Sequence, residues 1–335
     1  MTRSVLRLSL PLREPFVTSG GVVSARELAV LRVEDSDGAV GYGEAAPLES
    51  YDGVRLGAVI DELRTEGGAA LPQARAAEEL ARLDLVARRE GRTLGEPGAI
   101  AIAVNRTLGG GPPEEVATRA REAVREGYSC LKLKVGLPDD LERVAAVREA
   151  IGPWPALRVD ANGAWSLDEA RNAIAALAPF DLQLVEQPCR TLEELALLRA
   201  EVDVPLAADE SVTGPDDVRV AAELHACDAV NVKLASAGGF EAAREAVRAA
   251  RYSGLEPYLS STLDGPWGIA AALQLAASER LSLACGLATL ELFDARLARA
   301  LPRPRMGLMA VPPGPGLGVE VEPEALEAVV VERVS

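Results

Sequence analysis

Histidine and lysine are scarce in this 335-residue sequence, and the shortage narrows the chemistry that it supports. There is a single histidine, His225, and three of the 35 basic residues are lysines: Lys132, Lys134 and Lys233. Arginine fills the other basic positions. Arginine cannot be deprotonated in a protein, whereas a lysine side chain loses its proton when burial or a neighbouring cation lowers its pKa. The three lysines are therefore candidates for acid–base chemistry, and their placement decides whether the shortage is more than a bias of composition.

Long apolar runs and clustered cysteines are also missing. No segment approaches the ~18 consecutive apolar residues of a membrane helix, and the first residues have too short an apolar run for a signal peptide. We therefore expect a cytoplasmic protein without a membrane partner. The net charge of −16 repels nucleic acid. The cysteines form no Cys-x-x-Cys pair and no Cys/His cluster, so they predict small buried residues and no zinc or iron–sulfur site. They are Cys130, Cys189, Cys227 and Cys285.

Short apolar runs alternate with amphipathic helical patterns from about residue 99 onward. This alternation is typical of repeated βα units and a parallel sheet. Eight such runs favour an α/β fold with a closed TIM-like barrel, and no Gly-x-Gly-x-x-Gly follows the first run to suggest an open doubly wound sheet. The runs are 99–104, 130–135, 157–162, 182–187, 205–210, 229–234, 257–262 and 281–287.

The segments that flank the barrel predict a second domain. Residues 1–95 have strand-like stretches at 4–10 and 28–34, followed by helical patterns, which indicates an α+β unit. The Pro/Gly-rich segment 311–326 is expected to return the chain to this unit. We therefore predict a capping domain of residues 1–95 completed by 305–335, and a catalytic barrel of residues 96–304. Within the barrel, Ser166 with Glu169 and Thr191 with Glu194 predict capping boxes at two helix starts.

The lysines and three acidic residues fall at corresponding points of successive βα units. Lys132 and Lys134 are two residues apart, so on a strand both project from one face, which we expect to be the interior. Two ammonium groups held this close disfavour each other's charge, so one of them can act as a base. An edge strand with both lysines in water is the alternative. Lys233 follows at the end of the sixth run.

Between the lysines, Asp160, Glu186 and Asp209 each stand near the carboxyl end of a successive run. They should therefore converge at one rim of the barrel, where three uncompensated carboxylates would repel one another. A hard cation resolves this repulsion, so Mg²⁺ is the expected cofactor, with Mn²⁺ as an alternative. The competing interpretation is that these acids cap the helices that follow. His225 precedes the sixth run, at the opposite end of the barrel, and is expected to be structural.

Taken in order, these motifs resemble the enolase superfamily, and within it the muconate-lactonizing subgroup. The resemblance extends to PFVTSGGVVSA at 15–25, GYGEAAPL at 41–48, NVKLASAGG around Lys233 and PGPGLGVE near the C-terminus. It implies a (β/α)₇β barrel under an α+β capping domain. It also implies that Lys134 is the acid/base, that Lys132 tunes it, and that Lys233 is either the opposite base or a cation that stabilises the enolate. Asn162 and Glu210 resemble the residues that support the metal ligands.

Two late segments resemble o-succinylbenzoate synthases: YLSSTLDGPWGIAAALQLA at 258–276 and ACGLATLELFDARLA at 284–298. This resemblance implies a magnesium-dependent dehydration in menaquinone biosynthesis, with Ser260, Ser261 and Thr262 at the succinyl carboxylate of a small carboxylate substrate. Arg158 is a further candidate substrate contact, with a structural salt bridge as its alternative. Racemization of N-succinylamino acids, dipeptide epimerization and muconate-type cycloisomerization stay open. The Asp-x-Asp that dipeptide epimerases place after the eighth strand is missing. An inactive scaffold and a homo-oligomeric assembly are not excluded.

Overall fold

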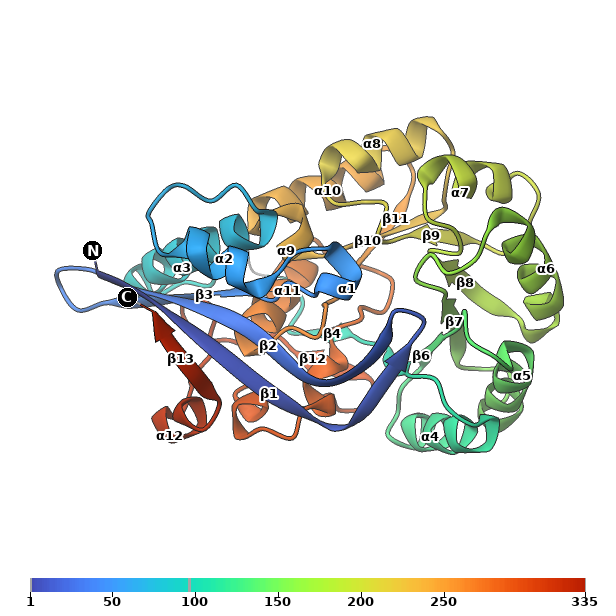
Figure 1. Ribbon diagram of the computed structural model, residues 1–335, viewed down its shortest axis with the longest axis horizontal. Helices are drawn as coiled ribbons and strands as arrows, with labels where there is room; N and C mark the ends of the chain where they lie inside the picture. Colours follow the sequence, from blue (N-terminus) through green and yellow to red (C-terminus); the bar gives the residue numbers. More distant parts are fainter. Residues whose placement is uncertain (1, 96–97, 335) are drawn as a thin grey trace.

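Four antiparallel strands form the sheet of the capping domain. The computed structural model describes residues 2–95 and 98–334. Strands β1 (Thr2–Thr18) and β2 (Gly21–Glu34) make a long hairpin whose tip reaches the barrel (Figure 1). β3 (Val40–Ala45) and β13 (Val330–Val334) flank the hairpin in the order β13–β1–β2–β3. Alternate residues of β1, among them Leu6, Leu8 and Leu10, are buried, as expected for a sheet with one packed face.

Helices α2 (Leu56–Leu63) and α3 (Pro72–Glu90) pack on this sheet, and α1 (Glu49–Asp52) leads from β3 toward the barrel. Two glycines of β3 allow α3 to approach closely. A Cβ atom at Gly41 would lie 2.2 Å from the carbonyl oxygen of Ala81, and one at Gly43 would lie 1.9 Å from that of Ala77. The Gly-Tyr-Gly of the sequence therefore fixes the distance between helix and sheet.

Seven parallel strands curve into the predicted TIM-like barrel, although the sequence predicted eight. In sheet order they are β5 (Arg106–Leu108), β6 (Cys130–Lys134), β7 (Ala156–Asp160), β8 (Leu182–Glu186), β9 (Leu206–Ala208), β10 (Ala229–Val232) and β11 (Glu256–Leu259). The second to seventh predicted runs match β6 to β11. Side chains of alternating strand residues fill the interior, and the carboxyl ends of the strands point toward the tip of the hairpin (Figure 1).

The first and eighth predicted runs differ from expectation. Within the first run, β4 (Ala101–Ala103) pairs antiparallel with β12 (Leu308–Ala310), so the parallel sheet begins only at β5. The eighth run forms no regular strand. Its Cys285 bridges Val104 and its Gly286 bridges Ser260, which closes the barrel through two residues. A run of apolar residues indicates burial, but the length of its pairing depends on neighbours that are distant in sequence.

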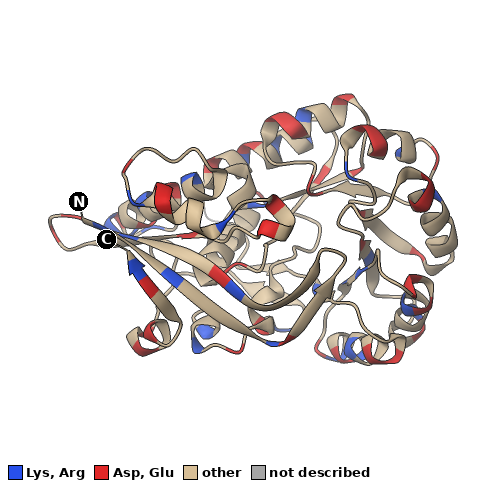
Figure 2. Ribbon diagram, in the orientation of Figure 1, with Lys and Arg blue, Asp and Glu red and all other residues tan. Residues whose placement is uncertain are grey.

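Helices surround the barrel, and most of the charged residues of this part of the chain lie on them (Figure 2). Both predicted capping boxes are confirmed, at Ser166 for α6 and at Thr191 for α7. In the described part of the chain, no helix is long and apolar enough to cross a membrane. The helices are α4 (Pro113–Arg125), α5 (Asp140–Ile151), α6 (Leu167–Leu177), α7 (Leu192–Arg199), α8 (Pro215–Glu223), α9 (Leu234–Ala237), α10 (Phe240–Tyr252), α11 (Pro266–Ser278) and α12 (Pro323–Glu327).

Glu44 of β3 joins the capping sheet to the barrel at the start of α11. Its carboxylate accepts hydrogen bonds from the backbone N–H groups of Gly265 (2.6 Å) and Gly268 (3.3 Å). Burial, together with the negative charge of Asp264, raises the pKa of Glu44 to about 8. The carboxyl group is therefore held in its neutral form at neutral pH, although it is an acid that titrates near 4.5 when unperturbed.

We expect the free energy of unfolding to fall as the pH rises from about 4.5 to about 8. The folded protein retains a proton on Glu44 in this window, whereas the unfolded chain has released it. Glu44→Gln should remove this part of the dependence because glutamine does not titrate. Urea unfolding midpoints at half-unit pH intervals measure it, with Glu193→Gln on the exposed surface of α7 as the matched control. Parallel curves for the wild type and Glu44→Gln would contradict the assignment.

Candidate active site and metal centre

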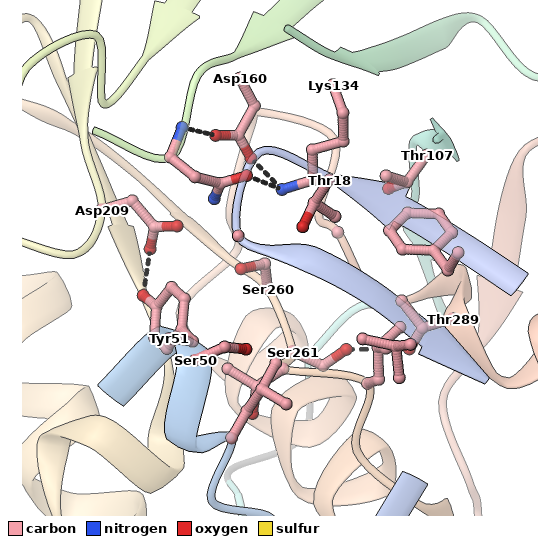
Figure 3. Close-up of a pocket in the computed structure, with 18 of the residues that line it drawn as sticks. Thr18, Ser50, Tyr51, Thr107, Lys134, Asp160, Asp209, Ser260, Ser261 and Thr289 are labelled. Carbon is pink, nitrogen blue, oxygen red and sulfur yellow. Dashed lines mark hydrogen bonds and ion pairs between the residues drawn. The ribbon is translucent and has the colours of Figure 1, made fainter. Parts of the chain in front are cut away.

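A cavity of about 280 Å³ lies between the carboxyl ends of the barrel strands and the capping domain. Residues 16–23, at the tip of the β1–β2 hairpin, form one wall, and Ser50 and Tyr51 of α1 form another (Figure 3). The barrel contributes the charged side chains, the Ser260–Leu263 loop and the segment after the eighth run. The site is therefore built jointly by the two domains.

Three carboxylates meet at the barrel side of this cavity. Asp160 and Glu186 are the last residues of β7 and β8 and are paired in register, and Asp209 follows β9 directly. One oxygen from each carboxylate lies within 4.8 Å of the others, and all three residues are buried. The structure thus brings together the three acids that the sequence placed at one rim.

Lys132 lies among these carboxylates. Its Nζ is 2.9 Å from Oε1 of Glu186 and 2.9 Å from Oδ2 of Asp160. Burial alone would lower the pKa of Lys132, but the charges of Asp160 and Glu186 outweigh burial and raise it. Burial likewise opposes ionisation of Asp160, yet Lys132 and Lys134 hold its pKa below the usual range. Lys132 is therefore a fixed cation of the site.

Lys134 and Lys233 enter the cavity from opposite sides, because β6 and β10 are four positions apart in the sheet. Lys134 Nζ donates to Oδ2 of Asp160 (2.6 Å) and to Oδ1 of Asn162 (2.8 Å). Lys233 Nζ donates to Asp209 and to the hydroxyl of Tyr51 (2.8 Å), and lies 4.5 Å from the centre of the Tyr51 ring. Both ammonium groups line the same cavity.

Asn162 and Glu210 lie beside Asp160 and Lys134. Asn162 adopts a left-handed backbone conformation (φ 49°), and its Nδ2 donates to Oε1 of Glu210 at 2.8 Å. Its backbone N–H also donates to Oδ1 of Asp160. Burial and the charge of Asp209 raise the pKa of Glu210 to about 8. Asn162 therefore orients Asp160 and Lys134 together.

The predicted Ser260–Thr262 contacts all line the cavity, but their hydroxyl groups differ in availability. The Oγ of Ser260 is buried and has no partner among the described residues. Ser261 shares a hydrogen bond of 2.8 Å with Thr289, whereas Thr262 donates to the carbonyl oxygen of Ala46 (3.1 Å) in the capping domain. Ser260 is thus the hydroxyl that is free to meet a ligand.

Arg158 is not in the cavity, contrary to the prediction. It is fully buried, donates to Gln183 (2.7 Å) and to the carbonyl oxygen of Ala284 (2.8 Å), and stacks on the ring of Tyr258. Two residues of strand separate it from Asp160, so it lies about 6.6 Å deeper in the barrel. Among the described residues, no carboxylate forms with it the salt bridge that was the alternative. His225, as expected, lies exposed before β10 and does not line the cavity.

Several cavity residues carry no signal in the sequence. Tyr51, whose hydroxyl donates to Asp209 at 3.0 Å, belongs to a four-residue helix of the capping domain. Thr107, Thr289 and Leu292 come from segments that meet only when the barrel closes. Asn231 donates to Glu186 at 2.9 Å, and only its place two residues before Lys233 could have suggested that it faces inward.

The donor set fits a magnesium ion. Asp160, Glu186 and Asp209 offer carboxylate oxygens only, which Mg²⁺ prefers, and no histidine or cysteine lies with them in the described residues. Their burial beside one another without a cation would be costly, and the surrounding lysines compensate only part of the carboxylate oxygens.

Comparison with known proteins agrees with this geometry. A family model described as enolase C-terminal domain-like matches residues 115–325. The chain belongs to the enolase superfamily. The o-succinylbenzoate synthase of Thermobifida fusca is 40% identical over 62% of this chain and 66% of that enzyme. The protein is therefore an enzyme of this superfamily.

Two solved structures match over nearly the whole chain. The N-succinyl Arg/Lys racemase of Bacillus cereus superposes with a TM-score of 0.93 at 25% identity and covers 99% of this chain and 98% of that one. A dipeptide epimerase of Enterococcus faecalis, complexed with Mg and the dipeptide L-Leu-L-Tyr, gives 0.87 at 28% identity over 95% and 99%. Relatives of three different activities thus share this fold.

We expect Mg²⁺ to raise the midpoint of thermal unfolding of the wild type, because a ligand that binds only the folded state stabilises it. Glu186→Gln removes one ligand and should weaken Mg²⁺ binding by at least about tenfold, the lower range for changes around a metal ligand. The readout is the shift relative to each variant's own metal-free midpoint. Asp203→Asn, at an exposed position before β9, is the control. An equal shift in Glu186→Gln would remove Glu186 from the ligand set.

Proposed function

We propose that the protein is an o-succinylbenzoate synthase, which dehydrates a hydroxycyclohexadiene carboxylate bearing a succinyl group. The observation that carries the proposal is the charge distribution of the cavity. Its acids, Asp160, Asp209 and Glu210, all lie at the metal side. Away from them, the described lining consists of hydroxyl groups, glycines and apolar side chains. Such a wall suits an uncharged ring and a succinyl carboxylate held by neutral donors.

The segment after the eighth run supports this assignment. Its one acid between Ala284 and Phe293 is Glu291, and it turns away from the cavity to accept hydrogen bonds from Tyr128 (2.7 Å) and Arg106. Thr289 and Leu292 of the same segment face the cavity instead. The ammonium group of a dipeptide would find no carboxylate there, which disfavours dipeptide epimerization. The identity to the synthase of Thermobifida fusca points the same way.

The proposed elimination uses Lys134 as both base and acid. Its Nζ, held by Asn162 at 2.8 Å, takes the proton alpha to the substrate carboxylate and returns it to the departing hydroxyl on the same face. The C–H and C–O bonds break, a carbon–carbon double bond forms, and water leaves, so no oxidant is required. Lys233, paired with Asp209, stays a cation and stabilises the enolate from the other face. A magnesium ion held by Asp160, Glu186 and Asp209 would add positive charge at the substrate carboxylate.

Racemization of N-succinylamino acids is the second candidate, because Lys134 and Lys233 approach the cavity from opposite sides, as a two-base reaction requires. The overall likeness to the racemase of Bacillus cereus agrees with it. The uncharged far wall favours apolar side chains over arginine or lysine in such a substrate. A muconate-type cycloisomerization is supported by the overall likeness of the fold to a muconate lactonizing enzyme (TM-score 0.90 at 25% identity), but by no feature of the cavity described above.

We expect Lys134→Arg to lose dehydration by about 10²–10⁴-fold, the usual contribution of a general acid–base group, because arginine keeps the charge but releases no proton. Lys233→Arg should retain dehydration within about tenfold, since a cation is all that the position supplies. Formation of o-succinylbenzoate in the presence of Mg²⁺ is followed by absorbance. Racemization of N-succinylamino acids, followed by polarimetry, should be lost in both variants, whereas the lysine that remains can still exchange the alpha proton of one enantiomer in D₂O. A wild type that racemizes but does not dehydrate would replace the first proposal with the second.

A further inference from the structure

The loop between β11 and α11 lines the cavity but is held by the capping domain. Arg26 of β2 is buried, and its Nε donates to the carbonyl oxygen of Thr262 at 3.0 Å. Its Nη2 donates to the carbonyl oxygen of Ala46 at 2.5 Å, and this oxygen also accepts from the hydroxyl of Thr262. Arg26 and Thr262 therefore share one acceptor across the boundary between the domains.

Glu44 holds the other end of the same loop. The hydrogen bonds from Gly265 and Gly268 fix its carboxylate at the first turn of α11. Both glycines leave room for it, because a Cβ atom would lie 2.7 Å from Oε2 of Glu44 at position 265 and 3.0 Å from Oε1 at position 268. The carboxylate thus occupies the space that two side chains would otherwise fill.

The loop between these two anchors is strained. Leu263 has φ of +62°, in the left-handed region that a residue with a branched side chain rarely adopts, and its side chain lines the cavity. Asp264 accepts from the backbone and hydroxyl of Thr262, which tightens the turn. Such a conformation persists only where the surroundings impose it. Here the surroundings are the capping strands.

The hydrogen bonds of Arg26 are all directed to carbonyl oxygens, of Thr262, Glu27 and Ala46. Burying a guanidinium group is costly unless its donors are satisfied. Its charge is balanced at longer range by Asp264 and Asp52. Two of its three acceptors are the carbonyl oxygens of Thr262, in the cavity loop, and of Ala46, in the capping segment that contacts this loop. The buried guanidinium group therefore holds the loop against the capping domain.

We propose that Arg26 and Glu44 are positioning residues that set the shape of the Ser260–Asp264 loop and thereby the affinity for the part of the substrate remote from the metal. They touch no reacting atom and act through the free hydroxyl of Ser260 and the side chain of Leu263. The inference rests on the proposed function only where it names that part of the substrate as the succinyl end. The specificity of the barrel is then partly determined by how the capping sheet docks.

Hydrogen exchange of the full-length protein tests the inference without any substrate. We expect Arg26→Met and Glu44→Ala to speed amide exchange in peptides spanning 260–268 by at least about tenfold, because local opening becomes easier. Glu44→Gln keeps an acceptor for Gly265 and should stay close to the wild type. Arg32→Gln, on the same strand but in a half-buried ion pair with Glu34, is the matched control. Thr262→Val, which loses the hydroxyl bonds to Ala46 and Asp264 but keeps the backbone bond to Asp264 and the bond from Arg26, is the milder variant if Arg26→Met does not fold.

Kinetics separates positioning from general destabilisation. Arg26→Met should raise KM by about tenfold or more and change kcat by less than about threefold, since the loop contributes binding and not proton transfer. Its Mg²⁺ affinity should match the wild type because the metal ligands lie on β7 to β9. The inference is overturned if amide exchange in peptides spanning 260–268 is the same in Arg26→Met and the wild type. It is also overturned if exchange in peptides spanning 157–161 accelerates equally, or if the variant loses Mg²⁺ affinity as well. If the wild type has no dehydratase activity, the proposed function is wrong. The hydrogen-exchange result then still decides whether Arg26 and Glu44 position the loop.

Discussion

Three carboxylates and three ammonium groups share the carboxyl end of the barrel, and the rest of the molecule is arranged around keeping them together. Their formal charges cancel, which lowers the cost of placing them together, but the lysines pair with only part of the carboxylate oxygens. A divalent cation would leave this set with a net charge of +2, which an anionic ligand would offset in part. The barrel supplies the rigid strands that hold such a set in place, and the capping domain supplies the cover that keeps water from screening it.

Much of this arrangement could be predicted from the sequence because parallel strands impose a regular spacing. Asp160, Glu186 and Asp209 recur about one βα unit apart, and strands in register bring such residues to the same rim. Arg158 shows the limit of the argument. The alternation of side chains along a strand predicted correctly that Arg158 faces the barrel interior. It does not predict the depth of the side chain, which lies one layer below the rim and contacts Gln183 and Tyr258.

Contacts between the two domains were beyond the reach of the sequence for a different physical reason. Tyr51 reaches Lys233 across 182 residues of chain, and Arg26 reaches Thr262 across 236. Neither contact is set by a local period or a helix signal, since each depends on how the finished domains dock. The eighth run likewise shows apolar character but pairs through Cys285 and Gly286 alone. Local sequence patterns thus predict the helices and strands. The cavity wall contributed by the capping domain depends instead on how the two domains dock.

The pairing of β13 with β1 places the two ends of the chain side by side (Figure 1). During synthesis, the β1–β2 hairpin can form early, but its outer edge stays unpaired until residues 330–334 have left the ribosome. An exposed strand edge is a site for association with other nascent chains. The capping sheet is therefore completed by a strand that follows the whole barrel in the sequence, so its final form depends on a segment made after the barrel strands.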